Sequence, residues 1–156
     1  MLMTEKLSTS NVIYHISYSP IYKLSDRPMW FKDDIRQMLF ADDSENCYIY
    51  RIALLTNKGC NISDIQEKIT KKYGERYGDL AISLGENPDE EMSRDFAKVI
   101  KSVADVDYVI HDDYDLTDYQ NNNDSIFVLN PLKSCKILMR LDADFVRKVN
   151  DTKKLQ

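Results

Sequence analysis

A few side chains in this sequence could bind or transform a substrate. His15 lies in the β-branched and aromatic segment Val12–Ser17, and Asp124 directly precedes an apolar run that begins at Ile126. A histidine can accept or donate a proton near neutral pH, and a carboxylate can stabilise positive charge. Taken alone, His15 also fits a hydrogen-bonded structural residue and Asp124 an exposed residue before a strand. Both interpretations stay open at this point.

Well-known catalytic and metal-binding patterns are missing from the chain. It has no GxxxxGK[ST], GxGxxG, GxSxG or HExxH motif. Its 3 cysteines form no CxxC pair, so we expect reduced thiols and no disulfide or zinc framework. A calcium loop starting at Asp113 would need glycine where Asp118 stands and glutamate where Asp124 stands. We therefore expect no metal.

Composition and charge predict one acidic domain. The chain has 156 residues, of which 43% are apolar, and one domain usually takes roughly 100–200 residues. Its 21 basic and 26 acidic residues give a net charge of −5, which does not favour nucleic acid or anionic membranes as partners. No run approaches the roughly 18 apolar residues of a membrane span, and Met1–Ser10 lacks the apolar core of a signal peptide. We expect a cytoplasmic protein.

Hydrophobic periodicity predicts the elements that must position these residues. Val12–Ser17 is predicted to be a strand that ends before Pro20, and a short helix is predicted through Ile35, Met38 and Leu39. Two central helices follow, with apolar residues three or four positions apart. The first contains Ile62, Ile65, Ile69 and Tyr73, opens at Ser63 or Asp64 and ends at Gly74; the second contains Met92, Phe96, Val99, Ile100 and Val103 and opens at Asp89.

Strands and one long polar loop are predicted in the rest of the chain. Cys47–Leu55 reads as a strand in the first half. Near the C-terminus, Tyr108–Ile110, Ser125–Leu129 and Cys135–Met139 are expected to form adjacent strands, with the acidic loop Asp112–Asp124 between the first two. A loop of this length in a small domain is usually functional. The pattern predicts the α+β class and not alternating βαβ units.

Three segments in a fixed order make the chain resemble the ADP-ribosyltransferase superfamily. Tyr14–Ser17 is similar to the opening strand of that family, which carries His-Gly-Ser or His-Gly-Thr. Arg27–Asp33 resembles its aromatic-Phe strand. Val106–Pro131 resembles its late segment, in which a loop, an acid and a hydrophobic strand end in Asn-Pro. The resemblance spans residues 11–140 and implies a split β-sheet core with two central helices.

The resemblance also implies NAD as the substrate, with release of nicotinamide and transfer of ADP-ribose. Asp124 would stabilise the oxocarbenium character of the ribose, although the family acid is usually glutamate. Counting back from Pro131, the expected place of that acid falls on Ser125, so both positions stay open. The implied NAD-binding residues are His15 on the ribose, Ile16 and Ser17 on the nicotinamide amide, Arg27 on the diphosphate, and Trp30, Phe31, Tyr14 and Phe40 around the nicotinamide ring.

A basic protein is the implied acceptor. The loop residues Asp112, Asp113 and Asp115 would recognise it, and the chain has no lysine or arginine from Ser102 to Leu132. We therefore expect a small effector or toxin of bacterial or phage type, a glycosyltransferase that modifies a protein. The alternative is a non-catalytic inhibitor or antitoxin-like module that binds a basic partner through the same loop. Residues 11–141 would form the domain, between an N-terminal tail (1–10) and a C-terminal tail or short helix (142–156).

Overall fold

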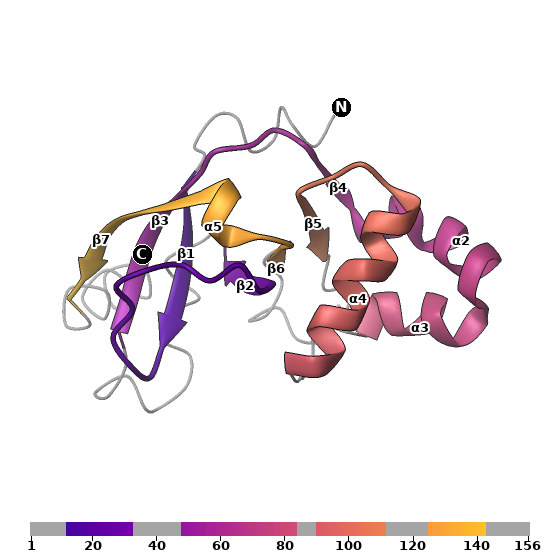
Figure 1. Ribbon diagram of the computed structural model, residues 1–156, viewed down its shortest axis with the longest axis horizontal. Coiled ribbons are helices and arrows are strands. Elements are labelled where there is room, and N and C mark those ends of the chain that lie inside the picture. The colour runs from indigo at the N-terminus through magenta and orange to yellow at the C-terminus, as the bar shows by residue number, and fades with distance from the viewer. Residues whose placement is uncertain (1–11, 33–47, 84–89, 112–124, 143–156) are drawn as a thin grey trace, which may run out of the picture.

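A mixed β-sheet with helices on one side forms the centre of the structure (Figure 1). The computed structural model describes residues 12–32, 48–83, 90–111 and 125–142. The strands are β1 (Val12–Ser17), β2 (Met29–Lys32), β3 (Tyr48–Leu54), β4 (Gly59–Asn61), β5 (Tyr108–His111), β6 (Ser125–Val128) and β7 (Cys135–Leu141). The helices are α2 (Ile62–Tyr73), α3 (Glu75–Ser83), α4 (Glu90–Val103) and α5 (Pro131–Ser134).

The sheet has seven strands in the order β4-β5-β6-β2-β1-β3-β7. The β4 and β5 strands are parallel, whereas every other neighbouring pair is antiparallel. This arrangement confirms the α+β class. The expectation that the three C-terminal strands are adjacent is wrong for β7, which pairs with β3 at the opposite edge from β5 and β6. The α5 turn after β6 redirects the chain across the sheet, and its start at Asn130-Pro131 suits a helix N-terminus.

The join between β1 and β2, where these two strands pair, has the fewest paired residues in the sheet. Tyr14 and Lys32 are the one register pair between these strands, while β2 and β6 have four and β1 and β3 have six. The strands nevertheless belong to one continuous sheet and not to two. In Figure 1 the helices α2, α3 and α4 gather beside β5 and β6, and β1, β3 and β7 lie on the other side of this join.

Each face of the sheet contributes to a separate hydrophobic cluster. One face buries residues from β1, β2, β3, β5, β6 and β7 together with Leu24, which lies in the connection between β1 and β2. The opposite face buries Val109 and Phe127 against α2, α3 and α4. We call these the loop-side cluster (Ile13, Leu24, Phe31, Tyr50, Ile52, Leu54, Tyr108, Ile110, Ile126, Val128 and Cys135) and the helix-side cluster (Ile62, Ile65, Ile69, Ala81, Phe96, Val99, Ile100, Val109, Phe127 and Leu129).

The two predicted central helices are present, but the start of α2 and the buried face of α4 differ from the prediction. Asn61 in extended conformation is the N-cap of α2, so the predicted start at Ser63 or Asp64 is wrong. The predicted end at Gly74 is confirmed, because its φ of 104° is a left-handed conformation that glycine tolerates. In α4, Met92 is 36% exposed and Ser93 is buried instead, so Met92 does not belong to the buried face.

A third helix, α3, was not predicted. Gly78 lowers the helix propensity of this segment, and its 9 residues are too few to show a clear helical repeat of apolar positions. A Cβ atom at Gly78 would overlap the side chain of Thr70 on α2, so the glycine allows the two helices to lie close together. Tertiary packing therefore outweighs local propensity in this segment. The predicted N-terminal tail (1–10), all of the predicted C-terminal tail (142–156) except Asp142, the helix through Ile35 and the start at Asp89 lie outside the described residues.

Candidate functional site

The three segments that carry the family resemblance form neighbouring strands in the middle of the sheet. The first two fold as β1 and β2, and the third contains β5 and β6, in the spatial order β5-β6-β2-β1. His15 lies on β1, Trp30 and Phe31 lie on β2, and Ser125 is the first residue of β6, paired with Lys32. Residues more than a hundred positions apart in the sequence thus meet within three adjacent strands.

His15 bridges the narrow join between β1 and β2. Its Nδ1 atom lies 2.8 Å from the backbone carbonyl oxygen of Trp30. Its ring packs against Phe31, with ring centroids 5.4 Å apart. A carbonyl oxygen only accepts hydrogen bonds, so Nδ1 carries the hydrogen and donates it. In the neutral ring, Nε2 is then a hydrogen-bond acceptor that suits a hydroxyl group of a ligand.

Burial keeps the His15 ring neutral. Removing the imidazole from water disfavours its charged form and lowers its pKa below the ordinary value of 6.5. The hydrogen bond to the carbonyl of Trp30 acts in the opposite direction but is the smaller effect. At neutral pH the side chain therefore has one donor, already used within the protein, and one acceptor.

The lowered pKa of His15 predicts a loss of stability on mild acidification. Below pH 6.5 the unfolded chain binds a proton on His15 that the folded chain does not, so the free energy of unfolding decreases as the pH falls. We expect a lower urea midpoint at pH 5.5 than at pH 7.5. His15→Asn, which lacks a group titrating in this range, should have a smaller pH dependence of the urea midpoint. If the urea midpoint changed with pH equally in the parent protein and in His15→Asn, the pH dependence would not come from His15.

Trp30 points to the opposite face of the sheet from His15. Its ring packs against Phe127 at 4.7 Å and edge-on to His111 at 5.9 Å, within reach of the helix-side cluster. Its Nε1 atom is buried and has no hydrogen-bond partner among the described residues. Phe31 lies on the His15 face but is only 1% exposed. In this conformation, a nicotinamide ring that contacts His15 cannot also stack on Trp30.

The other predicted NAD-binding residues that the structure describes lie on the same strands or on the connection between them. Tyr14 and Ile16 are half-buried on β1. The hydroxyl of Ser17 donates to the carbonyl of Ser19 at 2.7 Å and so stabilises the turn after β1. Arg27 is exposed in the β1–β2 connection. Asp124, Phe40 and the loop residues Asp112, Asp113 and Asp115 lie outside the described residues.

His111 is a residue that sequence reasoning did not select. It ends β5, pairs with Ser125 across to β6 and is 7% exposed. Its ring contacts Trp30, as described above. The available signal was its place at the end of a predicted strand, directly before the acidic loop.

The cysteine thiols described by the structure are poor nucleophiles. Cys60 and Cys135 are free. Burial raises the pKa of Cys60, with a further contribution from Asp64, and burial raises the pKa of Cys135 to about 12. Since the thiolate is the reactive form, neither group is activated at neutral pH. Within the described ranges, no group of three histidine, cysteine or acidic side chains is placed to hold a metal ion.

Comparisons with known proteins give no relative for this chain. No protein-family model, curated protein or solved structure matches it. None of the described helices has the length and apolar character needed to cross a membrane.

Proposed function

We propose that this protein transfers ADP-ribose from NAD to a protein acceptor with a basic surface. The observation that carries the proposal is the adjacency of β1, β2 and β6, the strands formed by the three segments that resemble ADP-ribosyltransferases. These segments follow one another along the chain in the same order as in the family. Because they are far apart in the sequence, their adjacency in the sheet supports the proposal. We further propose that the protein acts in the cytoplasm as an effector.

In this proposal, His15 binds the ribose. Its Nδ1–H donates to the carbonyl of Trp30, which leaves Nε2 to accept a hydrogen bond from a ribose hydroxyl. Asp124, at the residue before β6, stabilises the positive charge that develops on the ribose carbon as nicotinamide leaves. The acidic loop 112–124 attracts a basic acceptor through charge complementarity. No metal is required for these roles.

A non-catalytic interaction module on the same fold is the second candidate. The buried state of Phe31 and the position of Trp30 under the helices favour it, because neither ring offers an open stacking surface on the His15 face. In that case the acidic loop would bind a basic partner without any reaction on NAD.

Incubation of the protein with labelled NAD and a cell lysate separates these functions. A labelled protein band supports transfer to an acceptor. Free ADP-ribose without a labelled protein would show that the protein hydrolyses NAD and does not transfer ADP-ribose to an acceptor. The absence of both products, together with retained binding of a basic protein, would establish the interaction module.

His15→Asn provides the site-specific test. Asparagine can keep the donor to the carbonyl of Trp30 but has no group at the position of Nε2, so we expect weaker NAD binding and a smaller fall in melting temperature than in His15→Ala. Loss of one hydrogen bond of about 0.5–1.5 kcal/mol corresponds to roughly a 2-fold to 12-fold rise in Kd. Calorimetric titration with NAD measures this effect, and His15→Gln, which can reach the Nε2 position, should partly restore affinity.

His15→Ala removes both hydrogen-bonding atoms and the contact with Phe31. It should therefore lower the melting temperature as well as NAD affinity. If His15→Asn binds NAD as tightly as the parent protein, His15 has only the structural role at the join between β1 and β2.

A further inference from the structure

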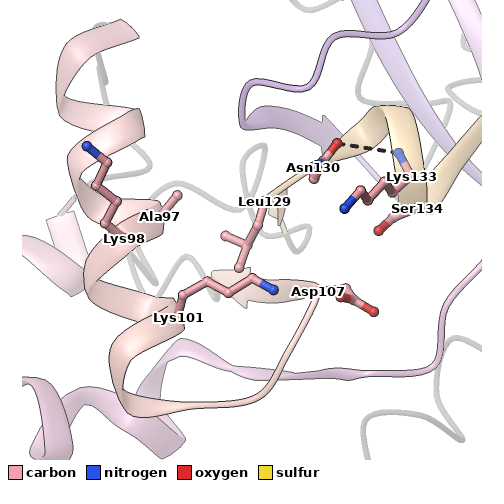
Figure 2. Close-up of a pocket in the computed structure, with 8 residues that line it drawn as sticks. All are labelled: Ala97, Lys98, Lys101, Asp107, Leu129, Asn130, Lys133 and Ser134. Atoms are coloured by element: carbon pink, nitrogen blue, oxygen red, sulfur yellow. Dashed lines mark hydrogen bonds between the residues drawn. The ribbon is translucent and has the colours of Figure 1, made fainter.

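A pocket separate from the His15 region lies between α4 and the segment that follows β6 (Figure 2). Its volume is about 390 Å³, within the range of roughly 300–1,000 Å³ that is usual for sites of small molecules. It is at the C-terminal end of β6, whereas Asp124 precedes the N-terminal end of that strand. The lining residues are Ala97, Lys98, Lys101, Asp107, Leu129, Asn130, Lys133 and Ser134.

The charge of this pocket is opposite to that of the protein. Three lysines line it, Lys98, Lys101 and Lys133, in a chain whose net charge is −5. Lys98 and Lys101 are three positions apart on α4 and therefore share a helix face. Figure 2 shows Lys101 and Lys133 extending from opposite walls toward the space beside Leu129, while Lys98 extends along α4.

The described part of the protein neutralises these ammonium groups only in part. Other lysines of this part form exposed ion pairs, such as Lys58 with Asp105 and Lys71 with Glu67. The single carboxylate of the pocket, Asp107, accepts a hydrogen bond from the hydroxyl of Thr56 at 2.5 Å. Two positive charges thus remain in excess, and a ligand with two negative charges would balance them.

The remaining lining residues give the pocket an apolar floor and neutral polar groups. Leu129 is 6% exposed and belongs to the helix-side cluster, and Ala97 stands beside it on α4. Ser134 contributes a hydroxyl group that can donate to an anion. The side-chain oxygen of Asn130 accepts from the backbone N–H of Lys133, which fixes the wall that carries this lysine. An anion with an attached apolar ring fits this lining better than a free inorganic ion.

We propose that this pocket binds a small phosphorylated molecule, with its phosphate between Lys101 and Lys133 and an apolar ring on Leu129 and Ala97. Lysine ammonium groups are common point-charge partners of phosphate. Lys98 adds long-range attraction at the edge of the site. The proposal does not depend on ADP-ribose transfer, because the pocket shares no residue with the predicted NAD site.

Calorimetric titration at 50 mM salt tests the proposal with pyrophosphate, adenosine 5′-monophosphate and adenosine as probes. We expect both phosphate probes to bind, the monophosphate more tightly than adenosine, and the affinity to fall at 500 mM salt. Lys101→Gln and Lys133→Gln should each weaken binding of the monophosphate about fivefold, and the double variant about twentyfold or more. Binding of adenosine as tight as that of its monophosphate would overturn the role of the lysines.

Lys68→Gln is the matched control, since it removes the same charge from an exposed position on α2 outside the pocket. It should change the affinity less than twofold. Circular dichroism spectra of all variants should match that of the parent protein, because the substituted lysines are exposed. Absence of binding by the folded parent protein up to about 10 mM of either phosphate probe, or equal losses in Lys68→Gln and Lys101→Gln, would refute the site. His15→Asn should bind the monophosphate with parent affinity, which separates this site from the proposed transferase function.

Discussion

Asp124→Asn is expected to slow ADP-ribose transfer about a hundredfold while the affinity for NAD barely changes. Asparagine keeps the size of the side chain but removes its charge, so a group that stabilises an oxocarbenium ion should lose turnover and not ground-state binding. Loss of one such preorganised electrostatic interaction costs about 3 kcal/mol in the activation barrier. Substitution of a carboxylate without a catalytic role should change stability by only about 0.5 kcal/mol. Single-turnover transfer from labelled NAD, with NAD affinity measured in parallel, distinguishes the two cases.

Asp112→Asn and Asp113→Asn are the controls for this experiment. They carry the same chemical change within the same acidic loop and should mainly weaken engagement of the basic acceptor. Ser125→Ala tests the neighbouring candidate position and should leave turnover within a factor of about two, since a serine hydroxyl cannot supply the charge. Transfer at the parent rate by Asp124→Asn, combined with loss of transfer in Asp112→Asn or Asp113→Asn, would move the catalytic acid to an earlier place in the loop.

Local pattern was sufficient to predict β1, β3, β5, β6 and β7, but not the order of the strands in the sheet. The β-branched and aromatic run Val12–Ser17 coincides with β1, and Tyr108–Ile110 lies within β5. The position of β7 beside β3 depends on pairing across more than 80 residues, which no local pattern encodes. The three-residue strand β4 was not predicted at all, because it exists through its long-range parallel pairing with β5. Strand existence follows from side-chain type, whereas strand order follows from which faces are buried together.

The candidate site was predictable in its residue types and not in its geometry. His15 and Trp30 were both selected from the sequence, and they are in contact through a backbone carbonyl. Successive residues of a strand point to opposite faces, so Trp30 and Phe31 cannot both face His15. Choosing between them requires the register of β2 against β1 and β6. That register is set by burial of Phe31 in the loop-side cluster, a long-range effect.

The lysine pocket illustrates the same limit for binding sites. Lys98 and Lys101 could be placed on one face of a predicted helix from their spacing alone. Lys133 reaches the same space only because β6 runs antiparallel to β5 and α5 then turns the chain beside α4. The absence of basic residues between Ser102 and Leu132 made this region seem uniformly acidic in the sequence. Folding instead brings lysines from both ends of that interval together.

Gly59→Ala is expected to destabilise the protein by about 2 kcal/mol, because overpacking a tightly filled core typically costs 1–3 kcal/mol. Gly59 pairs with Tyr108 between β4 and β5, and a Cβ atom at this position would overlap the ring of that tyrosine. Tyr108 is fully buried, so the ring cannot move aside into solvent. In a site with free space, glycine to alanine would instead stabilise by about 0.4–1 kcal/mol through the unfolded state, so the sign of the change is diagnostic.

The close approach of Tyr108 to Gly59 can be isolated by a double-mutant cycle with Tyr108→Leu. Leucine removes the ring that the new methyl group would overlap, although the smaller side chain lowers stability by itself. Gly59→Ala should then be neutral or stabilising in the Tyr108→Leu background, which gives a coupling free energy of about 2 kcal/mol from urea unfolding. An equal cost of Gly59→Ala in both backgrounds would mean that the glycine is required by the backbone of β4 and not by the aromatic ring above it.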